Sequence, residues 1–366
     1  MLKKTIKNFD YVILIVIILL FVIGILALKS ASGGAGGSID DYNKQIIWFS
    51  IGLVFLFAFS FLDYLFVKKF CLLLYGGSII LLILVLFSPI NNGATSWFKV
   101  GPMSFQPAEF AKIAIITLFA YLIEKHNEKR DLNKISTIVK LLLVLLVPTF
   151  LIIRQPDYGT AFVIIISCIV MLFIGEIDLK YIIAGLLLVI ILAPLVYNFV
   201  LPEHAKKRIE IFLNPGSDPK GAGYNILQSE LAVGSGGLTG QGLYNGNQTQ
   251  LGMLPMKSTD FIFSVISEEM GFIVSCSIII LYGILLLRLI NISQKSKDEF
   301  GKLFSIGVFT IFLAHIFENI GMSMGILPIT GIPLPFISYG GSSMLTNMIL
   351  IGISESIYIR KKQHLL

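Results

Sequence analysis

Charged residues are scarce in this chain. Only 14% of its 366 residues are Asp, Glu, Lys or Arg, whereas 55% are hydrophobic. Soluble globular domains carry roughly a quarter charged residues, so the composition excludes an ordinary soluble domain and predicts a polytopic membrane protein. The net charge of +6 does not indicate a nucleic-acid partner, because the basic residues lie in short connections between apolar runs.

Cysteine and histidine are also too few and too scattered for a metal centre or a disulfide framework. The three cysteines, Cys71, Cys168 and Cys276, each lie alone inside an apolar run, and we interpret them as small buried hydrophobes. The four histidines share no metal-ligand spacing. Residue patterns alone therefore predict no metal site.

Long apolar runs dominate what is present. A transmembrane helix needs about 20 predominantly apolar residues, and recurring runs near that length predict an all-α, polytopic integral membrane protein with about ten transmembrane helices in a single domain, 1–366. The first run follows three lysines and resembles a signal peptide, but its length favours an uncleaved helix. The runs cover residues 12–28, 46–66, 71–88, 107–124, 135–153, 159–176, 180–200, 262–288, 303–326 and 338–358.

The basic residues predict the orientation of these helices. Lysine and arginine gather before the first run, in the connections after the second, fourth, sixth and eighth runs, and at the end of the chain. Cytoplasmic connections are enriched in these residues, so we expect both termini to be cytoplasmic in the cell membrane. The external side then receives four polar connections, 30–45, 91–106, 201–257 and 328–338.

Two external connections have unusual compositions. Residues 201–257 form a long, glycine-rich extracellular loop in which 205–213 is the one amphipathic helix candidate; we expect the rest to fold back on the membrane surface. Residues 328–338 are dense in proline, which cannot continue a helix. Irregular backbone within a membrane must be shielded by protein or line a wet cavity, so 328–338 is expected to be a re-entrant segment.

A carboxylate lies at the external lip of the eighth run. Asp260 ends the long polar stretch and directly precedes 262–288. A carboxylate at that depth is costly unless it faces a polar cavity or a partner, so Asp260 is the candidate catalytic base. The alternative is that Thr259 and Asp260 only cap the helix. Glu268 and Glu269, two turns further on, fit a structural pairing as well as chemistry.

Other polar groups lie on the same side of the membrane. Glu109 and Lys112 are spaced for an i,i+3 ion pair, yet ionisable residues inside a span are also functional candidates. Asp157, between a proline and a glycine, favours a tight turn with a helix N-cap. His315 and Glu318 add polarity to the ninth run. We expect these groups to converge with Asp260 on one outward-facing cavity.

Several motifs together give the chain a strong resemblance. It resembles the SEDS proteins (shape, elongation, division and sporulation), and within them the rod-shape RodA branch more than the FtsW or SpoVE branches. The motifs cover most of the chain in family order and are Gln106-Pro107-Ala108-Glu109-Phe110-Ala111-Lys112, Gln155-Pro156-Asp157-Tyr158-Gly159-Thr160-Ala161, Arg208-Ile209, Gly234-Ser235-Gly236-Gly237, Gln248-Thr249-Gln250-Leu251, Thr259-Asp260-Phe261-Ile262-Phe263, Glu268-Glu269-Met270-Gly271 and Gly331-Ile332-Pro333-Leu334-Pro335-Phe336 through Ser343.

The resemblance implies a peptidoglycan glycosyltransferase with ten helices. Such an enzyme transfers the growing glycan from its undecaprenyl pyrophosphate carrier to lipid II on the outer face of the cytoplasmic membrane, for cell elongation and shape. It implies a class B penicillin-binding protein as partner, surrounding membrane lipid, and no certain cofactor, with a divalent cation (Mg²⁺ or Mn²⁺) as a possible aid. It maps the catalytic role onto Asp260. The substrate-binding candidates are Glu109, Lys112, Gln106, Asp157, Arg208, Gln248 and Ser338.

Three departures from the family pattern leave the cellular role open. Ser96 stands where an arginine is frequent, Met256 and Ser258 replace a glutamate and a histidine, and His315 stands where a glutamine is common. A division or sporulation paralogue therefore stays an alternative. From other classes, a flippase of lipid-linked precursor would share the broken helices and intramembrane charges, and a scaffold would not need Asp260. Crowding of the polar motifs toward the outer leaflet favours the enzyme.

Overall fold

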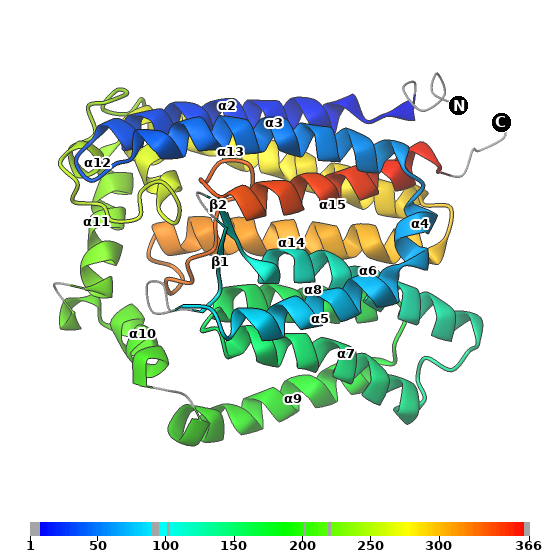
Figure 1. Ribbon diagram of the computed structural model, residues 1–366. Coiled ribbons are helices and arrows are strands. Elements are labelled where there is room, and N and C mark those ends of the chain that lie inside the picture. Colours follow the sequence, from blue (N-terminus) through cyan, green and yellow to red (C-terminus); the bar gives the residue numbers. More distant parts are fainter. Residues whose placement is uncertain (1–7, 90–94, 101–102, 201–202, 219–220, 362–366) are drawn as a thin grey trace.

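The computed structural model describes residues 8–89, 95–100, 103–200, 203–218 and 221–361. Long helices lie side by side along one axis, and α2 begins at the same end of the bundle at which α15 ends (Figure 1). We call this the basic end. The opposite end, which carries the predicted site motifs, is the motif end.

All ten apolar runs fall on helices, which confirms the all-α polytopic fold. Among the described residues, six helices are long and apolar enough to cross a membrane. Helices α5 and α8 are apolar but shorter, whereas α6 and α15 carry buried charged residues. The helices are α2 (Tyr11–Gly33), α3 (Ile39–Phe61), α5 (Cys71–Val85), α6 (Pro107–Glu128), α7 (Ile135–Ile153), α8 (Tyr158–Ile174), α9 (Leu179–Leu195), α13 (Ile262–Lys295), α14 (Glu299–Ser323) and α15 (Gly341–Ile359).

Shorter elements fill the connections. Helix α4 (Tyr64–Lys69) lies at the basic end, and a π-helical turn, η1 (Val196–Val200), extends α9. An antiparallel hairpin of β1 (Phe98–Val100) and β2 (Met103–Phe105), with Phe98 opposite Phe105, precedes α6. The sequence analysis did not predict this hairpin, since its strands are only three residues long.

One hydrophobic core cluster includes residues from Phe9 near the start to Ile359 near the end of the chain. Helix α9 is different, because none of its described residues is buried, and in Figure 1 it lies along the edge of the bundle. A helix that is apolar on all sides and packs on little protein is suited to contact with lipid.

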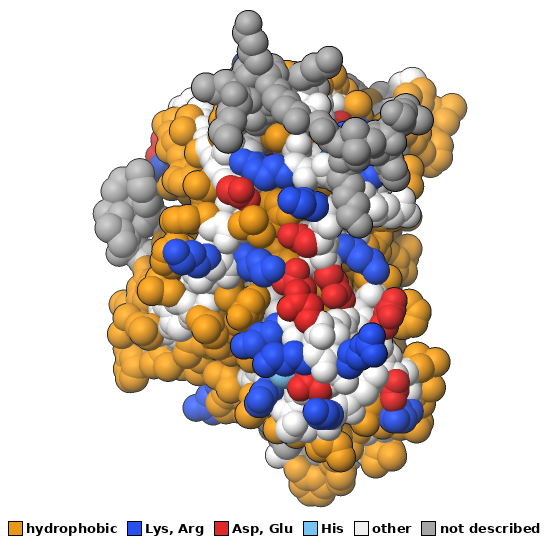
Figure 2. Space-filling view, turned by 90° about the vertical axis from the view of Figure 1, so that its right-hand side faces the viewer, with side chains coloured by type: hydrophobic (Ala, Val, Ile, Leu, Met, Phe, Trp, Pro, Cys, Tyr) orange, Lys and Arg blue, Asp and Glu red, His pale blue; other side chains and the backbone are white. Residues whose placement is uncertain are grey.

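The basic end is a charged face. Figure 2 shows Lys and Arg side chains interspersed with Asp and Glu over this end, with apolar side chains around them. Ion pairs form here: Lys68 of α4 pairs with Glu124 of α6, and Lys180 pairs with Asp178, two residues before it, at 2.6 Å. The charges that define this end are thus partly neutralised by one another.

Helix α13 is broken at Gly271, where the sequence predicted one continuous helix. Gly271 has φ 79° and ψ −175°, a conformation almost restricted to glycine. The N–H groups of Phe272 and Ile273 donate to the carbonyls of Gly237 and Leu238 at 3.0 and 3.2 Å. A segment of the long loop therefore inserts into the break and supplies the partners that the interrupted helix lacks.

The long loop is more structured than we expected. Helix α10 (Glu203–Leu213) confirms the amphipathic candidate, and η2 (Pro215–Ser217) follows it. Beyond it, α11 (Ala222–Ser235) packs against α13 and α12 (Asn247–Gln250) against both α11 and α13. The glycine-rich composition alone did not reveal this packing against α13, and the expectation that this part of the loop folds back on the membrane surface stays a prediction.

Residues 328–338 form the predicted re-entrant segment, with no helix or strand between α14 and α15. Tyr282, in the second half of α13, donates a hydrogen bond to the Pro335 carbonyl at 2.6 Å. The backbone of Ile337 lies against Gly24, which is nine residues before the end of α2 at Gly33. At 1.5 Å per helical residue, the segment reaches roughly 13 Å below the motif end.

Candidate active site

Asp260 lies between α14 and the re-entrant segment. Nδ2 of Asn319 donates to the Asp260 backbone carbonyl at 2.9 Å and to the Ile332 carbonyl at 2.8 Å. On its other side, a Cβ atom placed on Gly331 would lie 3.6 Å from Oδ2 of Asp260. The carboxylate thus faces the backbone of the re-entrant segment at a residue that has no side chain.

The N-cap alternative for Asp260 does not match the helix start. Helix α13 begins at Ile262 and its N-cap residue is Phe261, which makes no side-chain cap hydrogen bond. The backbone N–H groups of Thr259, Asp260 and Phe261 all turn back to the Met256 carbonyl, at 3.0–3.3 Å. A tight turn, rather than the first turn of the helix, therefore sets the position of Asp260.

Ser338 fastens the re-entrant segment to this turn. Its buried hydroxyl donates to the Thr259 carbonyl at 2.7 Å and accepts from the Leu334 N–H at 2.8 Å. Gln45 of α3 holds the next residues, donating to the Ser338 carbonyl at 2.8 Å. Through these bonds Ser338 holds the re-entrant segment against the Asp260 turn, whereas a role in direct substrate binding stays a prediction.

Lys112 lies in a buried cluster with Glu109 and His315. Its ammonium is fully buried and lies 2.9 Å from both Oε1 of Glu109 and Nε2 of His315. Because an ammonium can only donate, Nε2 of His315 must accept, which leaves the ring proton on Nδ1 facing the Pro333 carbonyl at 3.3 Å. The predicted ion pair is present, and both of its side chains are buried.

Gln106 and Asp157 meet beside this cluster. Nε2 of Gln106 donates to Oδ2 of Asp157 at 2.8 Å, and Oδ1 of Asp157 accepts from the Thr160 N–H at 3.1 Å. Asp157 is therefore the N-cap of α8, as the turn reading predicted. The side chain of Glu318 in α14 lies near enough for its charge to interact with Asp157 and Lys112, so the polar residues of α6, α8 and α14 converge.

Glu268 and Glu269 hold α12 in place. Glu268 accepts from the N–H groups of Gln248 and Thr249 at 2.7 and 3.0 Å, and Glu269 accepts from Ser30 and Gln250, both at 2.8 Å. Carboxylates suit this position, since they satisfy the free N–H groups at a helix start. These contacts match the structural pairing that the sequence analysis offered as one alternative, and Gln248 contacts Glu268 through its backbone N–H.

Lys257 closes the other end of α12. This buried ammonium donates to the Thr249 carbonyl at 2.7 Å and to the Ala35 carbonyl at 3.0 Å, and burial lowers its pKa. Ser96, one of the departures from the family pattern, is likewise buried and donates to the Gln155 carbonyl at 2.8 Å. Lys257 thus links the connection after α2 to the long loop. Ser96 links the connection before α6 to the turn before α8.

Two predictions are not settled by these contacts. Arg208 belongs to α10, but its side chain lies outside the described residues. No group of three His, Cys, Asp or Glu side chains among the described residues could hold a metal ion. A divalent cation at the site stays a prediction.

The sequence analysis missed Asn319 and Gln45, whose side chains hydrogen-bond the backbone around Asp260 and Ser338. A signal for Asn319 existed, since it lies four residues after His315 on the same helix face. Polar residues in this spacing within a span indicate a face turned to protein. Gln45 gave no such signal, because it lies at the polar start of α3.

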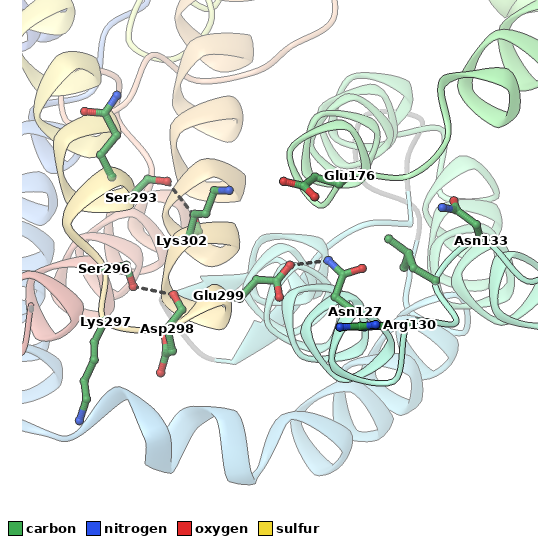
Figure 3. Close-up of a pocket in the computed structure, with 12 residues that line it drawn as sticks. Asn127, Arg130, Asn133, Glu176, Ser293, Ser296, Lys297, Asp298, Glu299 and Lys302 are labelled. Atoms are coloured by element: carbon green, nitrogen blue, oxygen red, sulfur yellow. Dashed lines mark hydrogen bonds between the residues drawn. The ribbon is translucent and has the colours of Figure 1, made fainter.

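A pocket of about 780 Å³ lies at the basic end of the bundle, whereas Asp260 lies at the motif end. Figure 3 shows its lining from the ends of α6, α8, α13 and α14, with Asn127 bonded to Glu299. Arg130, Lys297 and Lys302 are balanced by Glu176, Asp298 and Glu299 in the lining. The lining thus carries equal numbers of basic and acidic side chains, and no motif residue lines it.

Comparison with known proteins agrees with this architecture. The family model described as "Cell cycle protein", for FtsW, RodA and SpoVE, matches residues 10–363. The chain is 36% identical to peptidoglycan glycosyltransferase MrdB of Escherichia coli (strain K12), over 97% of this chain and 95% of that protein. It is 36% identical to stage V sporulation protein E of Bacillus subtilis (strain 168), over 96% of each. A chain from a solved peptidoglycan synthase complex matches with a TM-score of 0.84 and 27% identity, covering 97% of this chain and 99% of that one. The protein belongs to the SEDS family of FtsW, RodA and SpoVE.

Proposed function

We propose that this protein is a peptidoglycan glycosyltransferase that polymerises lipid II. It transfers the growing glycan from undecaprenyl pyrophosphate to the 4-hydroxyl of the acceptor sugar, for cell elongation. The observation that carries the proposal is the placement of Asp260 at the motif end, held by Asn319 and facing Gly331. Family membership and the name of MrdB support the same chemistry.

Asp260 acts as the general base. Its carboxylate takes the proton of the acceptor hydroxyl as the hydroxyl oxygen attacks the anomeric carbon, and the bond from that carbon to the pyrophosphate oxygen breaks. General-base catalysis from a positioned side chain contributes roughly 10²–10⁴-fold to rate. The displaced pyrophosphate leaves with its lipid carrier.

A cation must meet the negative charge that develops on the leaving pyrophosphate. Among the described residues, Lys112 is the candidate for this cation. Because its ammonium is buried, its positive charge acts on the pyrophosphate electrostatically rather than by direct contact. Arg208 is the second candidate by sequence. A divalent cation would have to arrive with the substrate, because Mg²⁺ binds through one or two carboxylates plus substrate phosphates. None of the reaction steps proposed above takes place at such an ion.

The flippase alternative fits the buried core less well. Between the Lys112 cluster and the basic end lies a layer of fully buried apolar side chains that includes Phe119, Phe304 and Ile311. A transporter places its site near the midplane and opens it to both sides. The polar groups here lie on the motif-end side of this apolar layer, which favours an enzyme that works on one side of the membrane.

The orientation follows from the charged face. The basic end carries the lysine-rich and arginine-rich connections (Figure 2), so we place it, and both termini, in the cytoplasm. The motif end and Asp260 then face the outside, where lipid II is polymerised. Identity to MrdB and to the sporulation protein is equal at 36%, so a sporulation or division role is the second candidate.

The test is polymerisation of lipid II by the purified protein and its Asp260→Asn variant. We expect wild type to make glycan chains and Asp260→Asn to make none, because the change is nearly isosteric but removes the proton acceptor. Gel filtration and thermal melting in detergent establish that the variant is folded. Glycan synthesis by folded Asp260→Asn at a near wild-type rate would show that Asp260 is not the base.

A further inference from the structure

We propose that Asn319 is the positioning residue for Asp260, because it ties the backbone of the catalytic residue to the re-entrant segment. This inference rests on the proposed function of Asp260 as the base. It adds a residue of α14 to the working parts of the site, although Asn319 touches neither substrate nor the reacting carboxylate.

The hydrogen bonds of Asn319 leave little freedom. Both acceptors of its amide nitrogen are backbone carbonyls, those of Asp260 and Ile332, at 2.9 and 2.8 Å. An amide nitrogen has two N–H groups and a carbonyl can only accept, so both N–H groups are committed and the amide has one orientation. Asn319 is fully buried, so water does not compete for these bonds.

Asn319 is carried by a rigid element with a second contact on the same face. Four residues earlier in α14, His315 contacts the Pro333 carbonyl and the ammonium of Lys112. Two successive carbonyls of the re-entrant segment, those of Ile332 and Pro333, thus face one side of one helix. Through Asn319 the same helix face also holds the Asp260 backbone, so one element positions both Asp260 and Lys112.

The tie controls where the carboxylate lies. Asp260 belongs to a turn whose N–H groups return to Met256, and Ser338 holds only the preceding carbonyl, that of Thr259. The Asn319 amide joins the Asp260 carbonyl to that of Ile332, one residue from Gly331, which the carboxylate faces. Displacing a catalytic group by about 1 Å can cost on the order of 10²-fold in rate.

The test compares Asn319→Leu with a matched control, Asn347→Leu. Leucine keeps the branched shape of asparagine but has no donor. Asn347 is also a buried asparagine on a helix, in α15, but within the described part of the chain its amide donates to the Ser343 hydroxyl alone, at 3.3 Å. The turnover number with saturating lipid II, its pH profile, and hydrogen exchange of residues 256–262 are measured for wild type and both variants.

We expect Asn319→Leu to lower the turnover number roughly 10- to 100-fold, to shift the acid limb of the pH profile, and to speed exchange at residues 256–262. Asn347→Leu should leave all three near wild type. An unfolded fraction would scale the pH profile without shifting it, so the shift separates positioning from general damage. Wild-type turnover and exchange in folded Asn319→Leu would overturn the proposal.

Two provisions keep the result decisive. If Asn319→Leu does not fold, Asn319→Ala is measured in its place, and a wild-type acid limb with wild-type exchange in that variant overturns the proposal. If wild type makes no glycan from lipid II, the proposed function fails. Hydrogen exchange then still reports whether Asn319 fixes the Asp260 turn, because it does not depend on activity.

Discussion

Nε2 of His315 lies 2.9 Å from Nζ of Lys112, although 203 residues separate them in the sequence. The contact places an uncharged ring, protonated on Nδ1, against a buried ammonium. A ring that accepts on one side and donates on the other can be replaced by an amide, since a glutamine side chain has both a carbonyl and an NH₂ group. His315 is thus one of the departures from the family pattern that the structure explains.

His315→Gln should keep polymerase activity within a few-fold of wild type, because the glutamine carbonyl can accept from Lys112 and its amide can donate to Pro333. His315→Leu should lower activity by about tenfold or more, since it leaves a buried donor and a buried acceptor unpaired. Rates of glycan synthesis from lipid II check both variants. Equal loss in the two would mean that the imidazole itself is needed.

Lys112→Met should impair turnover more than Lys112→Arg, because positive charge toward the pyrophosphate is required. Part of the loss would be structural, since Oε2 of Glu109 already has no hydrogen-bond partner among the described residues. Breaking a buried ion pair by removing one partner costs about 3–5 kcal/mol.

The double change Glu109→Gln with Lys112→Met separates the two effects. Removing both partners avoids an uncompensated buried charge, so the double variant should regain thermal stability. We expect it to stay inactive, because the charge of Lys112 no longer acts on the leaving group. Recovery of glycan synthesis in the double variant would assign the pair a structural role only.

The sequence predicted the helices and the re-entrant segment better than the contacts between them. Apolar runs of spanning length located all ten long helices, and prolines in 328–338 located the re-entrant segment, since both features act locally. The break at Gly271 was missed because its partners, Gly237 and Leu238, lie more than 30 residues away. Asn319 was passed over for the same reason, since an amide's acceptors are not readable from its own helix.

Gly271→Ala should destabilise the protein strongly, whereas Gly283→Ala in the same helix should be tolerated. A Cβ atom on Gly271 would lie 2.2 Å from the Gly240 nitrogen, and its φ of 79° is strained for other residues. At Gly283 a Cβ atom would meet nothing within 4 Å, and alanine favours the helix by about 1 kcal/mol. Thermal melting in detergent compares the two; equal midpoints would show that the inserted loop does not hold α13 in its broken form.

The remaining prediction concerns a partner. We expect a class B penicillin-binding protein to supply crosslinking and to raise the polymerisation rate. Large apolar side chains on α13 and α14, among them Ile273, Ile280 and Phe317, are exposed. In lipid such faces associate through close van der Waals packing, and a single transmembrane helix suits them. The chain matched in the solved structures belongs to a peptidoglycan synthase complex.

The route for activation would run through the long loop. Segment 237–242 lies in the break of α13 and donates backbone hydrogen bonds to the carbonyls of Glu268 and Glu269. The side chains of these two glutamates hold α12, which precedes Asp260 in the chain. A partner that prefers one arrangement of this loop would shift the population of the active site toward it. Polymerisation should therefore be faster with the co-purified synthase than without it, at saturating lipid II. Equal rates, with the complex shown to be intact, would leave physical coupling but exclude activation.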